Sequence, residues 1–308
     1  MKKFLALVLV FVLSLGTVAF AADFKDMPDD WSTSALEAAV ANGLLGGNGG
    51  YIYPSDNMTR AEMATIMVRA CGAIDEANIS GYTDVKPEDW FYASMAKAVA
   101  MGAFTGSDNK LNPESPITRQ EAFLVLSRVF GLYADKDDLK AIDAFKDGEK
   151  VAEWAKEGVA AIISSGYVAG ADGYLNPLNN ISRAEFAVVM DRLVKYYIDD
   201  AAAEIPTDGN VMIRVPGVAL DKLETSNVVI LGDGMGKEDI TIADANMTGK
   251  LVVRAGKKVS VSGNLGGVSI AASGITLEGD PHKIKHIHVC KGSTFSAPLI
   301  MLTEPSEK

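Results

Sequence analysis

Cysteine is scarce in this 308-residue chain, which holds only Cys71 and Cys290. Two cysteines are too few for a disulfide framework. Cys71 lies in a segment of helical character and Cys290 in one of strand character. We expect two free thiols, because free buried cysteine is common, with a single bridge in an oxidising compartment as the alternative.

Basic residues are also in short supply, with 29 lysines and arginines against 40 acidic residues. This balance excludes non-specific attraction to nucleic acid or to an anionic wall polymer. An acidic polymer could therefore be held only at specific, locally basic sites. We expect no nucleic-acid partner.

Long hydrophobic runs are absent except at the start, where Lys2 and Lys3 precede the apolar run 4–15 and the small-x-small site Ala19-Phe20-Ala21. This pattern predicts a signal peptide over residues 1–21 and an exported, cleaved protein. No cysteine follows the run, so we expect no lipid anchor. Removal of the peptide takes away two lysines and moves the formal charge from −11 to −13. No membrane span is expected after cleavage.

Motifs of catalysis are missing as well. The chain has no Gly-x-Ser-x-Gly, no phosphate-binding loop and no nucleophile–base arrangement, so we predict neither an enzyme nor a cofactor. His286, His288 and Cys290 alternate along a probable strand and are ligands that zinc accepts. Three ligands on one strand rarely complete a tetrahedron, so we keep them as a weak metal candidate and expect no metal site.

What the chain does contain is one pattern repeated three times without a gap. In each copy a tryptophan lies 29 residues, and a loop glycine 13 residues, before the arginine of a Thr/Ser-Arg-x-Glu tetrad. A proline lies 6 residues before that arginine, and a further glycine 17 residues before it. The tryptophans are Trp31, Trp90 and Trp154, the loop glycines Gly47, Gly106 and Gly170, and the arginines Arg60, Arg119 and Arg183. Each copy predicts a helix, a loop and a second helix.

The tetrad predicts the start of the second helix. Thr59, Thr118 and Ser182 with Glu62, Glu121 and Glu185 form capping boxes, which explain these six residues without any ligand. The arginine stands at the first helical position, where the macrodipole disfavours a cation. It pairs with an acidic loop residue such as Asp56 or Glu114, or it serves as an anion receptor, and we favour the second. The tryptophan is either core or a platform for a sugar face.

These residues resemble the S-layer homology family, whose repeat opens with a Phe-x-Asp segment and ends in an Ile-Thr-Arg-Ala-Glu helix start. The openings are Phe24-Lys25-Asp26, Tyr82-Thr83-Asp84 and Phe145-Lys146-Asp147, and three copies cover about residues 24–197. The resemblance implies a mainly α, pseudo-threefold domain with a central helical bundle. It also implies grooves between copies that bind secondary cell-wall polysaccharide, often capped by a pyruvylated amino sugar.

Carried over residue by residue, the resemblance implies three glycan-binding roles. Arg60, Arg119 and Arg183 supply charge, Trp31, Trp90 and Trp154 supply packing surface, and Gly47, Gly106 and Gly170 allow close backbone approach. A carboxylate suits a bidentate arginine, and a ketal methyl suits an aromatic face.

The last hundred residues have another character. Short β-type runs at 239–242, 251–253, 259–261, 268–270 and 275–277 are separated by Gly, Asn and Asp. They predict a small all-β module, a β-solenoid with a sandwich as the alternative. Some stretches are similar to solenoid segments found beside S-layer homology repeats.

Together these inferences divide the chain into a signal peptide (1–21), three repeats (22–80, 81–143 and 144–198), a linker (199–210) and a β-rich module (211–308). We expect a secreted cell-surface protein, anchored non-covalently to an acidic wall polysaccharide or modified peptidoglycan, with other surface-layer proteins as possible partners. The alternatives are a subunit of an S-layer lattice and a wall-anchored glycan-active enzyme.

Overall fold

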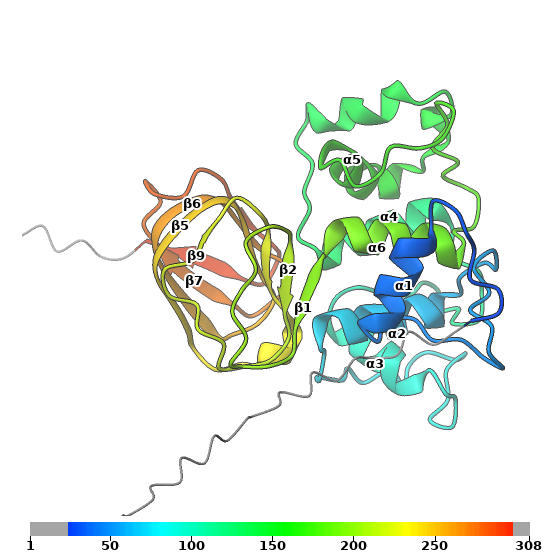
Figure 1. The fold of residues 1–308 in the computed structure, drawn as a ribbon, viewed down its shortest axis with the longest axis horizontal. Helices are drawn as coiled ribbons and strands as arrows, with labels where there is room; N and C mark the ends of the chain where they lie inside the picture. The colour runs from blue at the N-terminus through cyan, green and yellow to red at the C-terminus, as the bar shows by residue number, and fades with distance from the viewer. Residues whose placement is uncertain (1–23, 298–308) are drawn as a thin grey trace, which may run out of the picture.

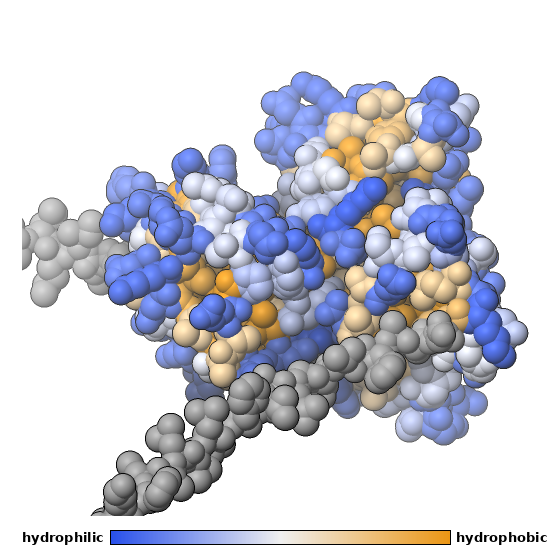
Figure 2. All heavy atoms as spheres, viewed as in Figure 1, coloured by the Kyte–Doolittle hydropathy of each residue, from blue (hydrophilic) through white to orange (hydrophobic). Residues whose placement is uncertain are grey.

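The computed structural model describes residues 24–297, in which a set of helical repeats adjoins a β-solenoid (Figure 1). The expected signal peptide lies outside these residues. Hydrophilic side chains cover most of the outer rim of both parts, and hydrophobic residues show toward the middle of each (Figure 2). Among residues 24–297, no helix is long and apolar enough to cross a bilayer.

Each repeat contributes two α-helices, as the sequence predicts. The first helices are α1 (Thr33–Ala41), α3 (Tyr92–Ala100) and α5 (Lys156–Ser164), and the second are α2 (Arg60–Cys71), α4 (Arg119–Val129) and α6 (Arg183–Leu193). Short 3-10 helices η1 (Asp138–Ala144), η2 (Gly148–Lys150) and η3 (Glu153–Ala155) precede α5. All three predicted capping boxes form and fix the start of the second helices.

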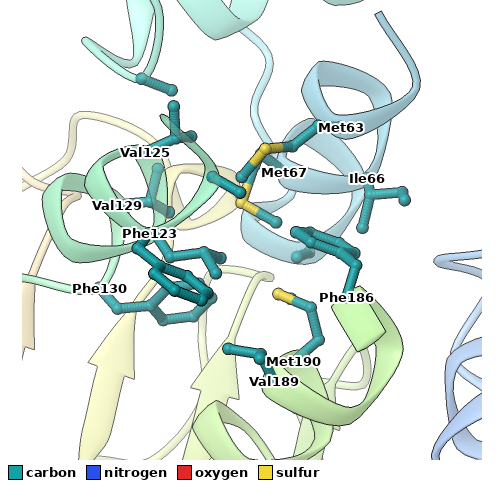
Figure 3. Packing of buried hydrophobic residues seen from close by; sticks show 14 of the residues in the cluster. Met63, Ile66, Met67, Phe123, Val125, Val129, Phe130, Phe186, Val189 and Met190 are labelled. Carbon is teal, nitrogen blue, oxygen red and sulfur yellow. The ribbon is translucent and has the colours of Figure 1, made fainter. Parts of the chain in front are cut away.

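The second helices share one core. Met63 of α2, Phe123 of α4 and Phe186 of α6 are fully buried and lie close to one another (Figure 3). Met67 and Met190 extend the same cluster. The stripes that the sequence predicts as core therefore meet at the centre of the helical part.

The repeats interlock instead of folding as separate helical hairpins. The first helix of each copy packs against the second helix of the preceding copy: α3 on α2, α5 on α4, and α1 on α6. Three backbone hydrogen bonds form a closed circuit, from Met58 N to Ile181 O, from Ile181 N to Ile117 O and from Ile117 N to Met58 O. The first copy therefore contacts the last as each contacts its neighbour.

The C-terminal part is a β-solenoid, as the sequence predicts, and all its strand pairs are parallel. Its strands are β1 (Tyr196–Ile198), β2 (Val211–Ile213), β3 (Glu224–Thr225), β4 (Val229–Leu231), β5 (Ile240–Val253), β6 (Lys258–Ile270), β7 (Thr276–Gly279), β8 (Ile287–Val289) and β9 (Thr294–Ser296), with a 3-10 turn η4 (Asp233–Met235). Strand β1 already pairs with β2, so residues 199–210, expected as a linker, connect two strands of the solenoid.

Successive coils place equivalent residues in register. Val211, Val229, Leu251 and Val268 lie in one stack inside the solenoid. The next residues along these strands point the other way, because side chains alternate along a strand. Of these, Met212, Ile230 and Val252 belong to the core cluster of the helical repeats, so this face of the solenoid packs on the helices.

Polar groups of the solenoid cap the helix ends at this junction. Arg254 is buried, and its guanidinium donates to Val129 O at the end of α4 (3.1 Å) and to Met101 O at the end of α3 (3.1 Å). Arg214 donates to Arg69 O near the end of α2 (2.8 Å). Asn210 donates to Leu193 O, the last residue of α6 (3.1 Å). The solenoid thus meets the C-terminal end of every second helix.

Candidate functional site

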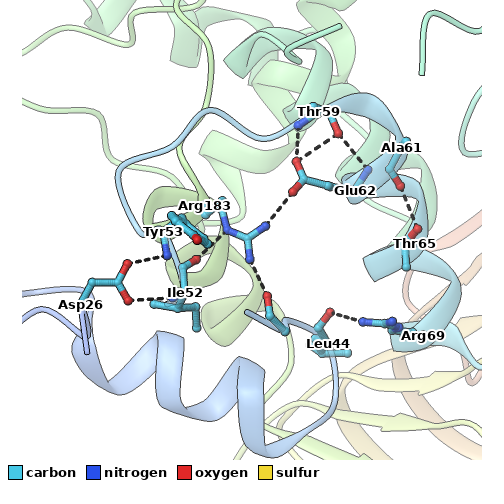
Figure 4. A network of polar contacts seen from close by, with 11 residues as sticks. Asp26, Leu44, Ile52, Tyr53, Thr59, Ala61, Glu62, Thr65, Arg69 and Arg183 are labelled. Atoms are coloured by element: carbon cyan, nitrogen blue, oxygen red, sulfur yellow. Dashed lines mark hydrogen bonds and ion pairs between the residues drawn. The ribbon is translucent and has the colours of Figure 1, made fainter. Parts of the chain in front are cut away.

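Each tetrad arginine reaches into a different copy of the repeat. In the case of Arg183, Nε donates to Ile52 O (2.9 Å) and Nη1 pairs with Glu62 Oε1 (2.8 Å), as Figure 4 shows. The guanidinium of the third copy is thereby held by the first. The same two contacts join Arg60 to Leu111 and Glu121, and Arg119 to Leu175 and Glu185.

The acidic partner differs from both residues that the sequence suggested. Neither Asp56 nor Glu114 pairs with the arginine; its partner is the capping-box glutamate of the next copy. Glu62 accepts from Thr59 N with Oε2 and from Arg183 with Oε1, so one carboxylate caps a helix and joins two copies. Sequence reasoning missed this second role, because nothing in the spacing shows which copies touch.

The guanidinium groups are largely shielded from water. The side chains of Arg60, Arg119 and Arg183 are 15%, 13% and 9% exposed. Burial lowers the pKa of Arg60 and of Arg119, and the adjacent glutamates Glu121 and Glu185 oppose this shift. An arginine stays charged in either case. Each site therefore presents a fixed, partly desolvated cation.

The tryptophans lie at the surface, which answers the question of core or platform. Trp31, Trp90 and Trp154 are 63%, 67% and 57% exposed. An indole that exposed is free to stack on another ring or on a sugar face.

The arginine and tryptophan of one copy do not share a groove, although their 29-residue spacing first drew attention to them. A groove of about 530 Å³, here called the Arg183 groove, is lined by Arg183, Gly47 and Trp90. A second groove of about 600 Å³, the Arg60 groove, is lined by Arg60, Gly106 and Trp154. Each groove thus combines an arginine from one copy, the loop glycine of the next and the tryptophan of the one after.

Arg119, Gly170 and Trp31 are the remaining predicted site residues. They are the combination that the same order leaves for a third groove. The predicted site residues therefore group across copies and not within them.

The loop glycines have a reason inside the fold. A Cβ on Gly106 would lie 2.6 Å from Lys110 O and 2.6 Å from the ring of Tyr82. Gly47 and Gly170 would clash in the same way, with Phe24 and Phe145. The glycine makes room for the aromatic residue that opens each repeat.

An aspartate in each opening segment holds the loop in place, and the sequence analysis gave it no role. Asp26 accepts hydrogen bonds from Ile52 N (2.7 Å) and Tyr53 N (2.8 Å). Asp84 and Asp147 do the same with Leu111 and Asn112 and with Leu175 and Asn176. The fixed Phe-x-Asp opening was the available signal.

The weak metal candidate does not come together. No group of three or more His, Cys, Asp or Glu side chains suited to a metal occurs among residues 24–297. His288 stacks on Tyr133, and burial lowers its pKa. Cys290 Sγ donates to Ala272 O (3.2 Å), and both Cys71 and Cys290 are free thiols.

Comparison with known proteins bears on the same region. The S-layer homology domain matches residues 23–64, 81–123 and 144–187. The surface-layer 125 kDa protein of Lysinibacillus sphaericus is 30% identical over 196 residues, 62% of this chain and 16% of that protein. The S-layer protein sap of Bacillus anthracis is 25% identical over 264 residues, 82% of this chain and 30% of that protein.

An enzyme is among the similar proteins too. The amylopullulanase of Thermoanaerobacterium thermosulfurigenes is 26% identical over 175 residues, 56% of this chain and 9% of the enzyme. The chain spans less than a third of the length of each of these three relatives.

Proposed function

We propose that this chain, which carries three S-layer homology domains, is a cell-surface protein held non-covalently on the wall by an acidic polysaccharide. The proposal extends to a secondary wall polymer with pyruvylated sugars, and to export through the signal peptide 1–21. Similarity to S-layer proteins supports the surface location.

One observation carries the proposal: an exposed indole and a shielded guanidinium line the same groove. Trp154 with Arg60, and Trp90 with Arg183, offer an aromatic face beside a fixed positive charge. A sugar ring with a carboxylate presents the complementary pair, an apolar face and an anion. Folding needs the arginine, as its contacts to the next copy show, but it does not require a tryptophan more than half exposed.

We further propose that the three copies form one pseudo-threefold unit with three such grooves. The closed circuit of contacts between Arg60, Arg119, Arg183 and the glutamates of the neighbouring copies supports this arrangement. Several weak sites on one rigid body bind a repeating polymer more tightly than any single site does.

The test is sedimentation of the protein with purified cell walls, with and without pyruvyl groups. Replacement of Trp31, Trp90 and Trp154 by alanine should abolish sedimentation with pyruvylated walls, because it removes the stacking surface from all three grooves at once. The tryptophans are better targets than the arginines, whose loss would also break contacts between repeats.

A matched control replaces two exposed hydrophobic residues that line neither groove. Ile74 and Leu139 are 61% and 40% exposed, and the Ile74→Ala, Leu139→Ala double variant should sediment like the unmodified protein. Equal sedimentation of the triple tryptophan variant and the unmodified protein would refute the proposed function.

Catalysis and lattice formation are the alternatives, and we propose binding alone. Glycan cleavage by the purified chain would show an enzyme. Ordered arrays of the purified chain across salt and Ca²⁺ conditions would show a lattice subunit.

A further inference from the structure

The two grooves have opposite charge, although the sequence pattern makes them equivalent. Around Arg183 the lining includes the three carboxylates of Asp56, Glu62 and Glu114. Around Arg60 the charged lining residues are Arg60, Arg128 and Glu121, two cations and one anion. The Arg183 groove is net negative and the Arg60 groove net positive.

The two tetrad arginines also differ in what they have left to offer a ligand. Nη2 of Arg183 donates to Gly46 O at 2.8 Å, so all three of its guanidinium nitrogens are engaged within the protein. Arg60 uses Nε and Nη1 for Leu111 and Glu121. Among residues 24–297, its Nη2 makes no hydrogen bond and can donate to a ligand.

Arg128 distinguishes the Arg60 groove further. It occupies the same place in the second copy as Arg69 in the first and Arg192 in the third. Arg69 donates to Leu44 O and Arg192 to Tyr167 O, both at 3.2 Å, so each is tied to its own repeat. Within the part of the chain that the structure describes, Arg128 makes neither a hydrogen bond nor an ion pair, and it lines the groove instead.

We propose that the Arg60 groove binds the carboxylated sugar of the polymer, with Arg128 as a second cation, and that the Arg183 groove binds uncharged sugar. This inference rests on the proposed function and assigns its ligands to particular sites. Nη2 of Arg60 and the guanidinium of Arg128 supply donors that strengthen when the acceptor is a carboxylate. In the Arg183 groove the same carboxylate would face three like charges, which disfavours it.

The three tryptophans allow each groove to be observed separately. The chain has three, and each indole N–H gives one signal in a ¹⁵N-correlation spectrum, assigned by single Trp→Phe variants. The full chain is titrated with the methyl glycoside of 4,6-pyruvylated N-acetylmannosamine, and separately with the same glycoside without the pyruvyl group. We expect the Trp154 signal to respond to the acidic sugar at a concentration at least about tenfold lower than the Trp90 signal.

Two sets of variants test the cause. Arg128→Gln should weaken the Trp154 response to the acidic sugar about tenfold, whereas Arg192→Gln, at the equivalent place in the third copy, should leave it unchanged. Asp56 and Glu114 are exposed, so the Asp56→Asn, Glu114→Gln pair should fold normally and bring the Trp90 response closer to that of Trp154.

The outcomes separate this inference from the proposed function. Equal responses of Trp90 and Trp154 to the acidic sugar, in a protein that sediments with pyruvylated walls, would overturn the division of grooves and leave the wall anchor standing. An unchanged Trp154 response in Arg128→Gln would overturn the role of that residue. A lack of response at every indole, together with no sedimentation, would overturn both.

Discussion

A cation at the first position of a helix opposes the helix dipole, yet Arg60, Arg119 and Arg183 all stand there. Their contacts explain why. Each guanidinium lies between a backbone carbonyl and a glutamate of another copy, so its charge is compensated locally. The position that the sequence marks as unexplained by folding is therefore partly structural, and only the remaining donors of Arg60 and Arg119 are available for ligand.

The sequence predicted capping correctly and partnership poorly, for a physical reason. A capping box is local, because hydroxyl and carboxylate lie three residues apart and their geometry follows from the helix. The pairing of Arg183 with Glu62 joins the third copy to the first, and it depends on how the repeats close. Identical spacing in each copy cannot distinguish a contact within a copy from one between copies.

Replacement of a loop glycine should destabilise the fold. In Gly106→Ala the new Cβ would lie 2.6 Å from Lys110 O, and the residue has φ +64°. We expect a loss of about 1 to 3 kcal/mol in the free energy of unfolding, measured by urea titration. Gly81→Ala is the control, because no atom lies within 4 Å of its Cβ. Similar midpoints for the two variants would contradict this account.

The two thiols should differ in reactivity. Burial raises the pKa of the Cys71 thiol to about 12, so this thiol stays protonated at pH 8.5, and it is also inaccessible. Iodoacetamide at that pH should modify only Cys290 in the native protein and both cysteines in urea, as mass spectrometry would show. Because the unfolded thiol ionises near its ordinary pKa of 9.0, Cys71 also contributes a loss of stability as pH rises from about 9 to 12. Rapid alkylation of native Cys71 would contradict its burial.

At the scale of elements, the solenoid was predicted in kind and missed in extent. The valine and isoleucine runs at 251–253, 259–261 and 268–270 fall within β5 and β6, since alternating β-branched residues suit a stacked strand. Strands β1, β2, β4 and β8 have three residues each, too few for alternation to show. Outward residues such as Met212, Ile230 and Val252 are apolar because the helices cover them.

Arg254 is the residue on which the junction of elements depends most. It is paired with Asp233 Oδ2 (2.6 Å) and donates to the terminal carbonyls of α3 and α4. Burial alone lowers the pKa of Arg254, and the Asp233 carboxylate raises it above its ordinary value. Arg254→Met should cost about 3 to 5 kcal/mol in urea unfolding, because Asp233 keeps its charge without a partner.

The matched control is Lys258→Met, which breaks an ion pair with Glu278 at the solenoid surface. An exposed pair contributes at most about 1 kcal/mol. Equal losses for Arg254→Met and Lys258→Met would show that the junction does not hold the two parts together.

At the scale of the whole molecule, repeats and solenoid share apolar surface and should unfold together. Met212, Ile230, Val252 and Ala271 of the solenoid belong to the core of the helical part. We expect a single calorimetric transition for the full chain. A fragment of residues 22–203 should melt several degrees lower or aggregate, because its helix ends lose their caps and cover. Two separate transitions in the full chain would contradict this coupling.

The positions of the two arginine sets have a mechanical consequence. Arg60, Arg119 and Arg183 begin the second helices, whereas Asn210, Arg214 and Arg254 hold the far ends of these helices. A polymer that pulls at the grooves and a load that drags on the solenoid would therefore stretch the same three helices from opposite ends. Each spans roughly 17 Å, at about 1.5 Å per residue. Shear at the cell surface would thus act along hydrogen-bonded helices in parallel, and not across a flexible hinge.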